Sequence, residues 1–161
     1  MRHTPLQRPD ALALALLAVL LAGCRGEPDT PEAQIRALVA RAQSAAEDRD
    51  AGALRDVISE RYADASGHDK RALTGIVAYH LMRNRSIHLL ARVGEIVLPE
   101  AGRADAVVYL AMAARPIPSV DALGGLRADI YRFDLQLAEE HPRDWKLVGA
   151  TWRPAELDDL Q

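Results

Sequence analysis

Apolar residues change their spacing once along the chain, from a helical period to a period of two. After residue 30, one apolar stripe with the spacing i, i+3, i+4 and i+7 consists of Ile35, Leu38, Val39 and Ala42. The stripe predicts a helix that runs to about residue 48. Asp29 or Thr30 can cap its N-terminus, and Pro31 suits the first helical position.

Two further helices are expected before the spacing changes. Asp50 caps a shorter helix that ends near Tyr62, and the small, polar residues 63–69 form a loop. Asp69 caps the third helix. Its apolar face consists of Leu73, Ile76, Val77, His80 and Leu81. We therefore expect the imidazole of His80 to lie among apolar side chains.

Beyond residue 85, apolar and polar residues alternate as they do in β-strands. The alternating segments are 86–99, 106–114, 127–140 and 145–154. Turns at 99–105 and 141–144 join them as hairpins, 115–125 is a long loop, and Gly94 is expected to mark a β-bulge. Three helices followed by four antiparallel strands predict an α+β fold with the helices on one face of the sheet.

The first thirty residues have the pattern of a secretory signal rather than of a folded element. Arg2 and Arg8 precede an uninterrupted apolar run over 11–21. That run is too short to span a membrane comfortably, which takes about 20 residues. Small residues then lead to Cys24, the single cysteine of the chain. One cysteine cannot form an internal disulfide, so Cys24 is free, paired between chains or modified.

Residues 21–24, LAGC, resemble the lipobox of bacterial lipoproteins. The resemblance implies removal of a signal peptide over 1–23, attachment of a diacylglycerol to Cys24, and acylation of the new N-terminus by a fatty acid such as palmitate. Several acyl chains would anchor the protein stably to the membrane. Arg25 follows the cysteine where aspartate often implies inner-membrane retention, so the resemblance favours the outer membrane, with the protein facing the periplasm. Residues 24–30 would form the lipidated cysteine and a polar tether.

The folded part resembles the nuclear transport factor 2-like domains. The residues that carry the resemblance are DRDAGALRDVISERYADASGHD, 48–69, and the final strand WKLVGATWRP, 145–154. It covers about 31–155 and leaves 156–161 as a C-terminal tail. The resemblance implies three N-terminal helices packed on a strongly curved four-stranded antiparallel sheet, a cone with a pocket between helices and sheet. The family includes isomerases and dehydratases, and also domains that only bind ligands or form dimers, so the fold does not decide the function.

Composition excludes several classes of protein. Hydrophobic residues make up 49% of the 161 and charged residues 27%, a globular balance. The net charge of −3 provides no basic surface for nucleic acid. No hydrolase, zinc-protease or phosphate-loop motif occurs, so no cofactor is expected. His80 and His88 lack a third ligand at suitable spacing, so no metal is expected either.

Few residues qualify as functional within the cone. Asp129 shares a strand face with Tyr131 and is a weak candidate for a catalytic base, and His80 could act as acid or base. The candidates for lining the pocket are His80, Met112, Tyr131, Phe133 and Trp152. The favoured hypothesis is a non-catalytic domain that binds a small apolar ligand or a protein partner. The alternatives are a ketosteroid-isomerase-like isomerase or dehydratase that uses Asp129 or His80, and a structural homodimer through the outer face of the sheet.

Overall fold

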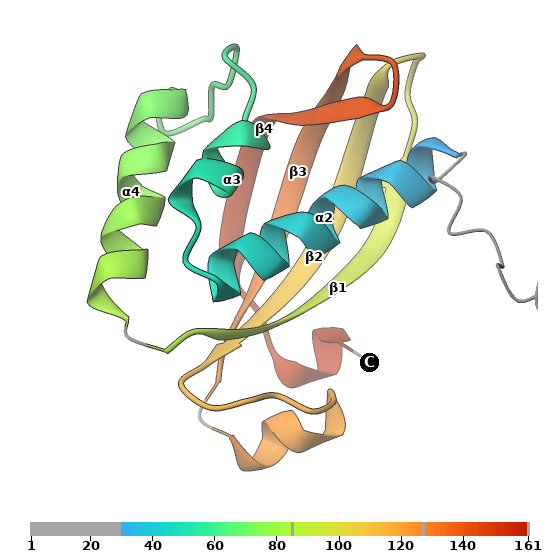
Figure 1. Cartoon of the computed structure of the whole chain (residues 1–161). Coiled ribbons are helices and arrows are strands. Elements are labelled where there is room, and N and C mark those ends of the chain that lie inside the picture. Colours follow the sequence, from blue (N-terminus) through green and yellow to red (C-terminus); the bar gives the residue numbers. More distant parts are fainter. Residues whose placement is uncertain (1–29, 85, 127, 161) are drawn as a thin grey trace, which may run out of the picture.

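Three helices precede four strands in the computed structural model, which describes residues 30–84, 86–126 and 128–160 (Figure 1). The helices are α2 (Pro31–Glu47), α3 (Ala51–Asp56) and α4 (Lys70–Arg83). The strands are β1 (His88–Val97), β2 (Arg103–Ala113), β3 (Asp129–His141) and β4 (Asp144–Pro154). Two short 3-10 helices, η1 (Asp121–Gly125) and η2 (Leu157–Leu160), complete the elements. The predicted α+β class is confirmed.

Each of the helices α2, α3 and α4 begins at a side-chain cap of the expected kind. Thr30 Oγ1 accepts a hydrogen bond from the Ala33 N–H at 3.2 Å. Asp50 and Asp69 cap α3 and α4 in the same way, with distances of 2.9 and 2.8 Å. These side chains satisfy amide donors that have no partner within the helix.

The second helix is shorter than the periodicity predicts, because the chain leaves it to pair with the sheet. The Leu147 N–H donates to the Val57 carbonyl, and the Ser59 N–H donates to the Leu147 carbonyl, both at 2.9 Å. Ile58 and Leu147 thus form a parallel bridge at the edge of β4. Backbone hydrogen bonds to a strand replace the helical ones that would have carried α3 to Tyr62.

The strands form one antiparallel sheet in the order β1-β2-β3-β4. The register of β1 against β2 shifts between Val93 and Ile96, and this interval contains the expected bulge at Gly94. A second shift, between Gln136 and Leu137 of β3, was not predicted. The sheet is twisted and bent (Figure 1), as hairpins with bulges are expected to be.

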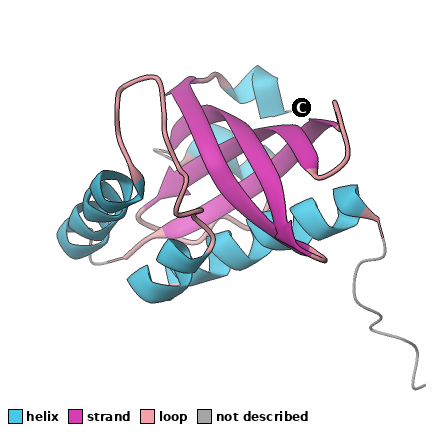
Figure 2. Cartoon of the chain, turned by 90° about the horizontal axis from the view of Figure 1, so that it is seen from above, coloured by secondary structure: helices cyan, strands magenta, loops and turns pink. Residues whose placement is uncertain are grey.

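The main core lies between α2 and the face of the sheet that we call the inner face. Its buried members are Ile35 and Leu38 from α2 and Ala104, Ala106, Leu137 and Trp145 from the strands. The Trp145 indole N–H donates to Gln34 Oε1 at 2.8 Å, so the polar atom of this buried ring has a partner. Figure 2 shows α2 along one side of the sheet and the C-terminal 3-10 turn on the other.

The opposite, outer face is covered at one end by η1 and η2. Ala111, Leu123 and Leu160 form the buried part of this second core. The sequence predicts an irregular loop over 115–125 and a tail over 156–161, but both segments contain a 3-10 turn that packs on the sheet. Elements of four or five residues are too short to show an apolar period, so the pattern could not reveal them.

The signal peptide, Cys24 and the tether expected before residue 30 lie outside the described residues. Within the described part of the chain, no helix combines the length and the apolar character needed to cross a bilayer. The membrane attachment inferred from the LAGC sequence therefore stays a prediction.

Candidate functional site

A row of aromatic side chains lies on the inner face, where β3 and β4 run beyond the main core. Tyr131 and Phe133 have ring centroids 6.4 Å apart, and those of Phe133 and Trp152 are 6.3 Å apart. Phe133 and Trp152 are directly paired across the two strands. Tyr131 and Phe133 are half-buried, whereas Trp152 is 42% exposed. These three residues therefore leave aromatic surface partly open to solvent on the inner face.

Of the predicted lining residues, the structure groups all but His80 on this face. Met112 is half-buried on β2, where its neighbours across the sheet are Leu89 and Asp129. Asp129 is exposed at the first residue of β3. His80, by contrast, is exposed in the last turn of α4 and makes an edge-to-face contact with the ring of Tyr79, centroid to centroid 5.8 Å. The apolar surroundings expected for His80 are not found, because only Leu81 is buried in α4.

The two tryptophans of β4 differ in burial, and Trp152 is the exposed one. β4 is an edge strand, and its end beyond Ala150 extends past the region that α2 covers. Trp145, seven residues earlier on the same strand, is the buried tryptophan, at 2% exposure. The two indoles therefore have different roles, one in packing and one at the surface.

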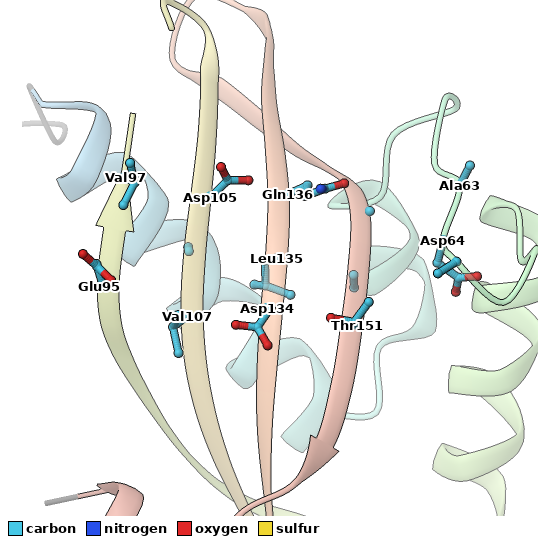
Figure 3. Close-up of a pocket in the computed structure, with 14 residues that line it drawn as sticks. Ala63, Asp64, Glu95, Val97, Asp105, Val107, Asp134, Leu135, Gln136 and Thr151 are labelled. Carbon is cyan, nitrogen blue, oxygen red and sulfur yellow. The ribbon is translucent and has the colours of Figure 1, made fainter. Parts of the chain in front are cut away.

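An open groove of about 480 Å³ lies on the outer face, beside the loop that joins α3 to α4 (Figure 3). Carboxylates project into it from three neighbouring strands and are those of Glu95, Asp105 and Asp134. Asp134 is paired with Arg132, whose guanidinium lies 2.6 Å from it. Within the described residues no group of histidine, cysteine or acidic side chains is arranged to hold a metal ion.

The loop beside this groove is organised around Asp64. Oδ1 of Asp64 accepts hydrogen bonds from the Ser66 and His68 N–H groups, each at 2.9 Å. Oδ2 lies 2.9 Å from His68 Nδ1 and accepts the Tyr62 hydroxyl hydrogen at 3.2 Å. Burial alone would raise the pKa of Asp64, but the hydrogen bonds from His68, Ser66 and Tyr62 lower it below its ordinary value. Burial, with the charge of Asp64, raises the pKa of Tyr62.

A second polar cluster joins the segment after α3 to β3. The buried Ser59 hydroxyl donates to Glu140 Oε1 at 2.5 Å, and the Arg61 guanidinium donates to the same oxygen at 3.2 Å. The bond from Ser59 lowers the pKa of Glu140 against the opposing effect of burial, and Arg61 lowers it further. Gly149 allows the same segment to approach β4, because a Cβ there would lie 3.3 Å from the Ala63 carbonyl oxygen.

Sequence reasoning passed over Asp64, Ser59 and Glu140. The run ADASGH, residues 63–68, was interpreted only as a polar loop. An aspartate two residues before a serine and four before a histidine is typical of a side chain that bonds the backbone of its own turn, and that signal could have identified Asp64. No sequence signal joins Ser59 to Glu140, because 81 residues separate them.

Solved structures share this fold at low sequence identity. A protein named as a dehydratase of the nuclear transport factor 2-like family, from Streptomyces avermitilis, matches with a TM-score of 0.62 and 14% identity over 80% of this chain and 99% of that one. A ketosteroid isomerase-like protein from Erwinia carotovora matches with a TM-score of 0.56 and 13% identity, over 77% of this chain and 95% of that one. A protein named as a putative scytalone dehydratase, from Novosphingobium aromaticivorans, matches with a TM-score of 0.60 and 10% identity, over 76% of this chain and 83% of that one. No protein-family model matches the chain, and no curated protein does.

These similarities identify the fold as nuclear transport factor 2-like, with three helices and a four-stranded antiparallel sheet. At identities this low they describe the arrangement of the backbone and not its chemistry. The chemistry available to this chain is therefore determined by its own side chains.

Proposed function

We propose that this chain is a lipid-anchored, periplasm-facing lipoprotein whose domain binds a small apolar ligand without catalysis. The observation that carries the binding proposal is the half-exposed row Tyr131–Phe133–Trp152 on the inner face. Exposing an indole beside two further rings costs free energy in water, and a bound apolar molecule would remove that cost. A small ligand suits this row better than a protein partner, because only three rings line it.

The proposed anchor is supported by the sequence. The LAGC motif, the apolar run before it and the arginines upstream of that run occur together, as they do in lipoprotein signals. The motif accounts for the chemistry of the single cysteine. An arginine after Cys24 favours the outer membrane.

The geometry offers little support to the isomerase or dehydratase alternative. A general base needs a position within hydrogen-bond reach of a substrate in a site that excludes water. Asp129 is exposed at the start of a strand, and His80 is exposed on α4. The most elaborate acidic arrangement, around Asp64, hydrogen-bonds its own loop and has a lowered pKa, the opposite of what an acid catalyst at neutral pH requires.

Ligand binding is tested with the protein purified in detergent and the apolar fluorophore N-phenyl-1-naphthylamine. Trp152→Ala should weaken binding of the fluorophore about tenfold, because it removes the most exposed ring of the row. Tyr79→Ala is the matched control, since Tyr79 is a similarly exposed aromatic residue, on α4. Equal affinity of both variants and the parent protein would contradict the proposal. Native mass spectrometry of the same preparation identifies any small molecule that co-purifies.

Anchoring is tested separately in cells grown with an alkyne-labelled palmitate. Cys24→Ala should abolish incorporation of the label and leave the unprocessed precursor. Normal processing of this variant would overturn the lipoprotein proposal and leave the ligand proposal standing.

A further inference from the structure

The end of the domain at which α2 begins also exposes apolar side chains on a strand turn. Val97 is 46% exposed and Leu98 is 38% exposed, at the end of β1 and in the turn to β2. The start of α2 lies at the same end of the molecule as this turn (Figure 1). The Arg36 guanidinium, in the second turn of α2, donates to the Val93 carbonyl at 3.1 Å. From this contact the start of the helix and the β1–β2 turn extend in the same direction (Figure 1).

This turn carries little charge that would oppose contact with lipid. Its sequence over 97–102 is VLPEAG, in which Glu100 is the one charged residue. Glu100 lies 3.9 Å from the Arg103 guanidinium, so part of its charge is compensated locally. Gly102, with a φ of 72°, turns the chain back into β2 and keeps the turn tight.

The proposed anchor would place this end close to a bilayer. Five residues, 25–29, separate Cys24 from the cap Thr30. A chain of that length spans at most about 20 Å even when fully extended. A lipidated Cys24 would therefore hold the start of α2, and the turn beside it, within one such length of the membrane surface.

We propose that the β1–β2 turn is a second membrane contact, in which Val97 and Leu98 enter the lipid surface that carries the anchor. This inference rests on the proposed lipid anchor. Two aliphatic side chains would not bind a membrane from solution, but tethering makes the contact intramolecular and raises its effective concentration. The contact would orient the domain with the η1 and η2 end directed away from the bilayer.

The test uses the full lipidated protein in vesicles of phosphatidylethanolamine and phosphatidylglycerol that contain doxyl-labelled lipid. An environment-sensitive dye is attached to Leu98→Cys, and to Asp121→Cys as a control on η1 at the other end of the domain. Lipidation leaves Cys24 unreactive toward the dye reagent. We expect quenching at position 98 to exceed quenching at position 121 at least threefold. Ala101→Cys, in the same turn, provides a second labelling site should the first substitution impair folding.

The results distinguish a failure of the membrane contact from a failure of the lipid anchor on which it depends. Intact mass of the purified protein first reports whether Cys24 carries acyl chains. Acylated protein with equal quenching at both positions overturns the membrane contact and leaves the lipoprotein proposal in place. Protein without acyl chains overturns the anchor, and the contact with it.

Discussion

The side-chain amide of Gln43 pairs with the edge of β1, where its Nε2 donates to the Leu89 carbonyl at 3.1 Å. Its Oε1 accepts from the Ala91 N–H at 3.2 Å, so one carboxamide satisfies two groups of the edge strand. Glu47 accepts from the Leu89 N–H at 2.9 Å, one helical turn later. Helix α2 thereby covers the backbone groups of an edge that could otherwise pair with another chain.

Gln43→Ala should destabilise the domain by about 1 to 2 kcal/mol, because two backbone groups lose their partners. Urea unfolding measures the change, and hydrogen exchange of the Ala91 amide should become faster. Arg41→Ala, an exposed position on the same helix, should change stability by less than about 0.5 kcal/mol. Equal effects of the two substitutions would show that the edge is held by other contacts.

Ser59→Ala should make the stability of the domain less dependent on acid. Ser59 and Arg61 hold the pKa of Glu140 below its ordinary value. The ionised carboxylate therefore stabilises the fold at pH values above its ordinary pKa, and this stabilisation is lost as the pH falls through the lowered pKa. Without the Ser59 hydroxyl we expect the free energy of unfolding to fall by about 1 kcal/mol near pH 6 and by less near pH 3. Unfolding free energies of both proteins across this range provide the measurement. A loss independent of pH would mean that Ser59 acts through packing and through the hydrogen bond that it accepts from the Arg61 N–H, and not through Glu140.

Asp64→Asn should lower the pKa of Tyr62. Burial raises that pKa first, and the Asp64 charge and hydrogen bond raise it further. Removing the charge therefore leaves the pKa of Tyr62 closer to its ordinary value but still above it, since burial persists. Ultraviolet absorbance of the phenolate follows this titration, with Asp121→Asn as a distant control. An unchanged titration would indicate that Tyr62 and Asp64 do not interact in solution.

The two tryptophans should differ in their contribution to stability. Trp145→Ala should cost about 3 to 5 kcal/mol, because the ring is buried and hydrogen-bonded to Gln34. Trp152→Ala should cost about 1 to 2 kcal/mol, because much of its ring is already in solvent. Thermal unfolding of both variants compares the two costs. Similar losses would mean that Trp152 is packed as tightly as Trp145.

The sequence predicts an element well where its apolar pattern repeats over a long segment. The caps at Asp50 and Asp69 and the bulge at Gly94 follow from local rules that need only neighbouring residues. Local patterns cannot say which apolar residues find a partner. His80 has the spacing of a core position, yet it is exposed because little packs against the last turn of α4.

The polar clusters show the other limit of prediction from sequence. Glu140 and Ser59 meet only because the chain after α3 pairs with β4 and reaches the end of β3. Alternation places Tyr131 and Phe133 on one face and makes them candidates for lining the pocket, whereas the pairing of Trp152 with Phe133 comes from the register of the sheet. The exposure of this aromatic row was not predictable, because it depends on where α2 ends over the sheet.

Leu160 makes the C-terminus a constraint on how the protein can be engineered. Its side chain is fully buried, packed in one cluster with Ala111 and Leu123. A fragment cut after residue 155, just beyond the end of β4, would remove η2 from the outer face and expose the apolar surface that Leu160 covers, which favours aggregation. An affinity tag should therefore be attached beyond η2 through a spacer rather than replace this turn. The shortest fragment that keeps the fold for crystallisation or display therefore includes η2.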